Sequence, residues 1–294
     1  MTDNNPKHVP AELSQSYLSP SMLKIKGSIK FVCPGMDSRS IDYSGRLESA
    51  YQEDFKPAFT VSLDQLIVPE ASPRSPGIGN PVIPVRYAGS KFIQFAEKNK
   101  KLAFEAMGIM VGKTKSKVAM RVISPKGVEV MKFDLEPRCS WMNSSDDGWQ
   151  KIEFIPDETG VYVVECLENN GNAYRIKSTI PGNAYFIDGE FRMVRPNGKV
   201  FFQVPRGIKN IKIEIGGEEN EPLSASLLDP QNTVVASLSN VTASKLLSFT
   251  RTDSSVSEIW AIEFSNSLED SFIRMGEGLV TVLSDRPEYL PLVP

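Results

Sequence analysis

The sequence predicts an all-β protein with two tandem antiparallel β-sandwich domains (jelly-roll or Ig-like) after a short irregular N-terminal segment. Three observations predict this class. Short runs alternate between apolar and polar residues, clusters of Gly, Pro, Asn and Asp separate those runs, and the pattern recurs about 100 residues further along the chain. The 294 residues are enough for two domains.

The N-terminal part of the chain differs from the rest in composition and in its pattern of predicted strands. Residues 1–27 are predicted to form a flexible tail, because prolines punctuate a polar stretch that has no apolar signal-peptide core. Residues 28–81 are expected to hold a few strands, at 29–33 and 59–63, and to end in a linker at 69–81 that contains four prolines.

Alternating runs predict strands at 117–123, 151–155, 160–166 and 210–215. In the last run Ile211, Ile213 and Ile215 share one face, and Lys212 and Glu214 lie on the other. Residues 97–110 contain helix formers, but their apolar residues alternate, which favours a strand.

An internal repeat divides the β region. Residues 93–95, 121–130 and 161–166 match 202–204, 226–235 and 259–264, with offsets of 109, 105 and 98. The repeat predicts domains at 82–187 and 188–294. In its middle block, Ser124-Pro125 before Gly127 and Asp229-Pro230 before Asn232 predict equivalent hairpin turns.

The second repeat resembles the bacterial pre-peptidase C-terminal domain and related secreted β-sandwich modules. The resemblance covers residues 85–294. It rests on a V-P-x-G turn at Val204-Pro-Arg-Gly207, followed by an alternating strand at 211–215. A D-P-x-G-like hairpin at Asp229-Pro-Gln-Asn232 and a Trp-containing strand at Trp260-Ala-Ile262 follow in the same order. The first repeat departs from it, with Ala96-Glu-Lys-Asn99 at the turn and Tyr162 in place of the Trp. The resemblance implies a secreted or surface accessory module with no catalytic residues.

Composition excludes several classes of function. The one histidine, His8, argues against Ser-His-Asp and Cys-His catalysis and against clustered histidine metal sites. The net charge of -3 shows no excess of the basic residues that bind nucleic acid. No apolar run is long enough for a membrane-spanning helix. Three cysteines, Cys33, Cys139 and Cys166, are expected to be free thiols, with a Cys139–Cys166 disulfide or a catalytic cysteine as alternatives.

One segment is a candidate ligand-binding site. Trp141 and Trp149 flank a polar stretch that contains Asp146 and Asp147, and aromatic rings beside carboxylates are common in sugar sites. A solvated loop, or a Ca²⁺ contact at the two aspartates, are the alternatives. No other metal or cofactor is expected.

These observations predict a non-catalytic β-sandwich binding or structural module that binds carbohydrate or the surface of a partner protein. An extracellular, periplasmic or cell-surface location is expected, and a cytoplasmic one is the alternative because the chain shows no signal peptide. A carbohydrate-active enzyme that uses two carboxylates is one competing function. A self-assembling surface or virion protein, joined through sheet edges, is the other.

Overall fold

The computed structural model confirms the all-β class. It describes residues 27–31, 39–43, 55, 58, 63–66, 83–140, 148–178, 182–217, 221–265, 267–288 and 290–292. Within these residues the elements are twenty β-strands and one 3-10 helix, η3 (Leu63–Gln65). The predicted tail and the linker at 69–81 lie outside the described residues, apart from Gly27.

The chain divides into two compact units, Met1–Phe55 and Lys56–Pro294. The first unit contains an antiparallel hairpin of β1 (Gly27–Phe31) and β2 (Arg39–Tyr43), in which Ile29 lies opposite Ile41. Strand β1 was predicted at 29–33, whereas β2 falls in a polar stretch for which no strand was expected. Of the strand expected at 59–63, only Leu63 is described, and it begins η3.

The second unit contains the remaining strands, which we describe in two halves. The strands of the N-terminal half (residues 83–187) are β3 (Lys91–Ala96), β4 (Leu102–Met110), β5 (Val118–Ile123), β6 (Glu129–Leu135), β7 (Pro137–Ser140), β8 (Gln150–Phe154), β9 (Gly160–Glu168), β10 (Ala173–Lys177) and β11 (Asn183–Phe186). Those of the C-terminal half (residues 188–292) are β12 (Phe191–Val194), β13 (Gly198–Val204), β14 (Asn210–Gly217), β15 (Leu223–Leu228), β16 (Val234–Val241), β17 (Lys245–Thr250), β18 (Glu258–Ser265), β19 (Asp270–Met275) and β20 (Val282–Leu283).

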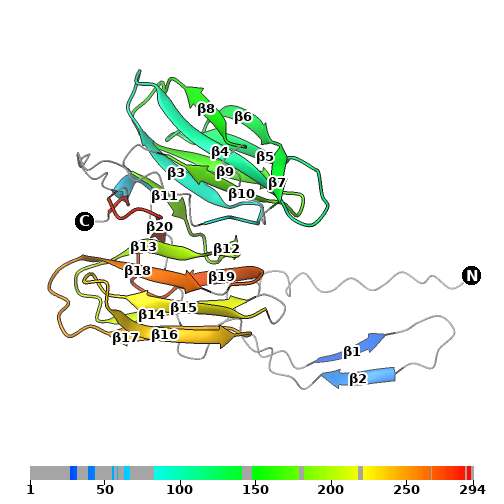
Figure 1. The fold of residues 1–294 in the computed structure, drawn as a ribbon, viewed down its shortest axis with the longest axis vertical. Coiled ribbons are helices and arrows are strands. Elements are labelled where there is room, and N and C mark those ends of the chain that lie inside the picture. The colour runs from blue at the N-terminus through cyan, green and yellow to red at the C-terminus, as the bar shows by residue number, and fades with distance from the viewer. Residues whose placement is uncertain are drawn as a thin grey trace, which may run out of the picture. The chain divides into compact units, whose positions relative to one another are not determined.

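The two halves have the same strand order, and Figure 1 labels the strands of each half. In the N-terminal half one sheet runs β3-β9-β5-β6, and β4 in the facing sheet pairs with β10 and β8. In the C-terminal half the corresponding sheets run β13-β18-β15-β16 and β19-β14-β17. The parallel pairing of β4 with β7 has no counterpart among the described strands of the C-terminal half.

Aromatic contacts between facing sheets hold each half together. Phe154 of β8 packs on Tyr162 of β9, with ring centroids 5.5 Å apart. Phe249 of β17 packs on Trp260 of β18 at 5.6 Å. Tyr162 and Trp260 are both buried, as the alternation of their strands predicts.

Backbone pairing joins the halves in both layers. In one layer β11 pairs with β3 on one side and with β20 on the other, and Ser284 beside β20 pairs with Phe201 of β13. In the other layer Val85 pairs with both Tyr174 of β10 and Met193 of β12. Each layer therefore continues from one half into the other, across the domain boundary predicted at residue 187.

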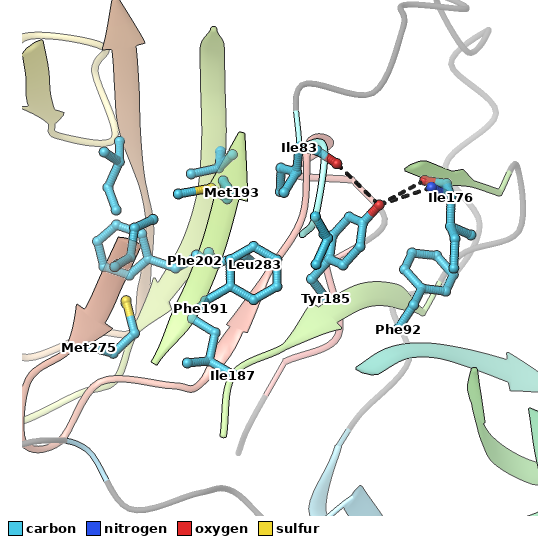
Figure 2. Close-up of a cluster of buried hydrophobic side chains, with 14 of the residues drawn as sticks. Ile83, Phe92, Ile176, Tyr185, Ile187, Phe191, Met193, Phe202, Met275 and Leu283 are labelled. Atoms are coloured by element: carbon cyan, nitrogen blue, oxygen red, sulfur yellow. Dashed lines mark hydrogen bonds between the residues drawn. The ribbon is translucent and has the colours of Figure 1, made fainter. Parts of the chain in front are cut away.

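A continuous hydrophobic core accompanies this pairing. Figure 2 shows Tyr185 between side chains of the two halves, with its hydroxyl bound to the backbone of Ile83 and Ile176. The ring of Tyr185 packs against Phe92 and Phe191, with centroids 5.2 and 5.5 Å away. A buried hydroxyl with its hydrogen bonds satisfied lets the aromatic ring fill the junction without an unpaired polar group.

The two predicted hairpin turns are confirmed. Gly127 and Asn232 have positive φ values of 79° and 66°, and their amides donate to the carbonyls of Ser124 and Asp229. The Asp229 carboxylate also accepts the amide of Thr233 at 2.8 Å. These contacts explain why a short polar residue begins each turn and a residue that tolerates the left-handed region ends it.

Candidate functional site

Of the four predicted ligand-binding residues, Trp149 is the one that the structure describes. Trp141, Asp146 and Asp147 lie outside the described residues, and the expected roles of all four stay predictions. Trp149 immediately precedes β8 and is half-buried. It packs against an apolar cluster of Met107, Ile109, Ala173 and Val194.

This cluster lies on the outer face of the sheet. Leu102, Phe104 and Ala106 of β4 belong to the main core, whereas Met107 and Ile109 belong to the cluster under Trp149. Successive strand residues point to opposite faces, so Glu105 shares the outer face with Met107. We call the outward side chains of β8, β4 and β10 around Trp149 the outer-face site.

Charged groups occupy one cross-strand row of this site. Glu105 of β4 lies opposite Lys177 of β10 on one side and opposite Lys151 of β8 on the other. The Lys177 ammonium is 2.8 Å from the Glu105 carboxylate and 4.1 Å from the ring centroid of Trp149. Lys177 therefore makes an ion pair and a cation–π contact together, on an accessible surface.

A second group of charges lies beside this row. Glu153 forms ion pairs with Lys151 and with Lys101, the latter at 2.7 Å. The hydrogen bonds from Lys101 and Lys151 lower the pKa of Glu153. With Glu105 and Lys177, the group contains three lysines and two glutamates, so these five side chains carry one surplus positive charge.

The C-terminal half has a buried counterpart of the Glu105–Lys177 pair. Glu214 of β14 and Arg274 of β19 lie directly opposite each other, at offsets of 109 and 97 from Glu105 and Lys177. Arg274 also lies over a ring, that of Phe272, at 4.6 Å. A carboxylate and a cation thus face each other at matching positions in both halves, while the ring beside the cation comes from β19 itself in the C-terminal half and from the residue before β8 in the N-terminal half.

The two pairs differ in their access to solvent. Side-chain exposure is 1% for Glu214 and 12% for Arg274, against 41% for Glu105 and 26% for Lys177. Arg274 binds Glu214 at 2.8 Å and also pairs with Glu190, while Ser244 donates to Glu214. The C-terminal pair is therefore closed by other protein groups, whereas the N-terminal pair can meet a ligand.

Cys166 lies in surroundings that do not suit nucleophilic attack. Cys166 is a free thiol buried in the main core, so the Cys139–Cys166 disulfide alternative is wrong. Burial raises the pKa of Cys166 to about 12, and the thiolate needed for nucleophilic attack is therefore scarce at neutral pH. In the described part of the chain, no group of three or more His, Cys, Asp or Glu side chains is placed to hold a metal ion.

Sequence reasoning singled out Trp149 but not the charged side chains beside it. Glu105 and Lys177 are distant from it along the chain, so no local motif connects the three residues. The repeat carried a usable signal, because its offset aligns Glu105 with Glu214.

No family model, curated protein or solved structure matches this chain. The resemblance to pre-peptidase C-terminal domains therefore stays a prediction. Over the described residues, no helix has the length and apolar character needed to cross a membrane.

Proposed function

We propose that this chain is a non-catalytic carbohydrate-binding module, built from two tandem β-sandwich repeats, with its ligand at the outer-face site. One observation carries the proposal: a half-buried tryptophan lies beside an accessible carboxylate and ammonium on the outer face of a sheet. A secreted or cell-surface location accompanies this proposal.

The chemistry of the site suits a sugar. A pyranose has an apolar C–H face that can stack on an aromatic ring, and its edge bears hydroxyls that both donate and accept hydrogen bonds. Glu105 can accept from one hydroxyl, and Lys177 can donate to another or to a ring substituent. Lys177 covers part of the Trp149 ring in the free protein, so we expect its side chain to move aside when a sugar stacks there.

Matching hydrogen bonds support the tandem part of the proposal. In the N-terminal half the amide of Lys98 donates to the hydroxyl of Thr159 at 2.9 Å. In the C-terminal half the amide of Arg206 donates to the hydroxyl of Ser257 at 3.0 Å. Each contact ties the turn after β3 or β13 to the loop before β9 or β18, as a duplicated fold would require.

Binding of the full chain to a glycan array, followed by calorimetry, tests the proposal. We expect Trp149→Ala to abolish binding to the best glycan. Ile155→Ala is a suitable control, because Ile155 is exposed and lies just after β8. Denaturation curves of both variants show whether they remain folded. Binding that persists in folded Trp149→Ala, or the absence of any glycan ligand, would overturn the proposal.

The sequence of β16 favours a second candidate, self-assembly through a sheet edge. Among the described strands β16 ends its sheet, it carries no charged residue, and Val234 at its start is exposed. Its counterpart β6 carries Glu129, Lys132 and Asp134, which discourage edge pairing. Sedimentation tests this candidate: Ser237→Lys should dissociate any dimer, and a wild-type monomer at all concentrations would exclude it.

A further inference from the structure

We infer that the ligand of the outer-face site is an acidic polysaccharide, whose carboxylates are recognised by Lys101, Lys151 and Lys177. The inference rests on the proposed function and adds a chemical class to it. Its basis is the surplus positive charge of Lys101, Lys151, Lys177, Glu105 and Glu153 taken together, on a chain whose net charge is -3.

The arrangement of the lysines suits a linear polyanion. Lys151 and Lys177 flank Glu105 on neighbouring strands, so their backbones stand two strand spacings apart, about 10 Å. Lys101 adds a third ammonium beside Glu153. A carboxylated chain lying across β8, β4 and β10 can meet these ammonium groups in succession and place one sugar ring on Trp149.

Lys101 and Lys151 remain available to a ligand because they share their carboxylate partner within the protein. Glu153 accepts from both Lys101 and Lys151, so one carboxylate serves two ammonium groups. The side chains of Lys101 and Lys151 are 58% and 61% exposed, and a ligand carboxylate can reach them without opening the fold. In the closed counterpart Arg274 is instead shared between two glutamates, which leaves no surplus positive charge at that pair.

Glu105 should lower the affinity of this site for an acidic ligand. Its carboxylate holds Lys177 over the ring in the free protein, but it repels the carboxylates of an acidic ligand. We therefore expect Glu105→Gln to strengthen binding of a polyanion several-fold. Glu97→Gln is the matched control, because Glu97 is exposed and pairs only locally, with Lys100. A purely structural Glu105 would not raise affinity when it is neutralised.

Calorimetry with polygalacturonate and with its methyl-esterified form tests the inference, because the two polymers share a backbone and differ in charge. We expect the full chain to prefer the free-acid polymer, with affinity that falls as salt rises. Lys151→Met with Lys177→Met should weaken binding about tenfold or more, since charge-assisted contacts are lost. The control pair is Lys113→Met with Lys115→Met, whose side chains are exposed elsewhere.

The outcomes separate this inference from the function on which it rests. If both polymers bind equally and Trp149→Ala abolishes both, the protein binds carbohydrate but not through charge, and the inference fails alone. If neither polymer nor any glycan binds, both proposals fail. If single-stranded DNA binds as tightly as polygalacturonate through the same two lysines, the surface is a general polyanion site and the inference is overturned.

Discussion

Replacing Arg274 by Met should destabilise the protein far more than replacing Lys177 by Met. The two cations occupy matching strands and face matching glutamates, and Met keeps most of the aliphatic stem in both variants. They differ in burial, because Glu214 is 1% exposed whereas Glu105 is 41% exposed. The comparison therefore isolates the effect of burial on one kind of ion pair.

The magnitude follows from what each substitution leaves behind. Without Arg274, Glu214 keeps a hydrogen bond from Ser244 but loses its cationic partner inside the protein. Leaving a buried charge uncompensated costs about 3–5 kcal/mol. Breaking an exposed pair such as Glu105–Lys177 costs at most about 1 kcal/mol, because water and salt already screen it. In a unit of this size, the Arg274 variant should melt roughly 6–20 °C lower.

Chemical denaturation of the two variants and the wild type gives the free energies of unfolding. A second variant sharpens the test: Arg274→Met combined with Glu214→Gln should be less destabilised than Arg274→Met alone, because no buried charge remains. Equal losses for Arg274→Met and Lys177→Met would refute the reasoning. So would a double variant that is as unstable as the sum of its single substitutions.

Three further predictions concern single positions. Cys166 should resist maleimide at pH 8 in the folded protein and react on unfolding, since burial raises the pKa of its thiol to about 12; equal rates in both states would contradict this. Gly276→Ala should lower the free energy of unfolding by about 1–3 kcal/mol in a denaturation curve, because its Cβ would lie 2.3 Å from the Lys212 carbonyl oxygen. Gly89 has a positive φ and open space around it, so Gly89→Ala measures the penalty of a positive φ alone. Burial raises the pKa of Asp285, so its ionised carboxylate lowers the stability of the folded protein at pH values above the unfolded pKa. Asp285→Asn should therefore melt at a higher temperature than the wild type at pH 7 and lose that advantage below about pH 3.8. An unchanged melting temperature at pH 7 would refute this prediction.

Alternation along single strands was enough to predict the fold class. Ile211, Ile213 and Ile215 are buried as their spacing indicates, and β4 is a strand despite its helix-forming residues. The same alternation predicted Glu214 on the face away from the core, and it is on that face. It could not predict that Glu214 would be buried there, because burial depends on Arg274 and Ser244, which belong to other parts of the chain.

The pairing between the two halves could not be predicted from the sequence, for a related reason. The repeat compares residues that play the same role in each half, so it contains no information about how one half meets the other. Val85 pairs with Met193 across the junction, and these residues are themselves 108 positions apart, close to the repeat offset. Equivalent segments therefore meet each other, which is the arrangement of a two-fold dimer interface built into a single chain.

This correspondence between the halves bears directly on the candidate site. The two pairs occupy matching strand positions and differ in the cation. Arg274 can bind Glu214 and Glu190 together through its planar guanidinium, which suits a buried, fully paired position. Lys177 presents one compact ammonium on a flexible stem, and it stays partly exposed beside Trp149. A buried arginine network fixes the sheet, whereas an exposed lysine can exchange its glutamate for a ligand carboxylate. The difference between the two cations thus accords with a structural role in the C-terminal half and, under the proposed function, with a binding role in the N-terminal half.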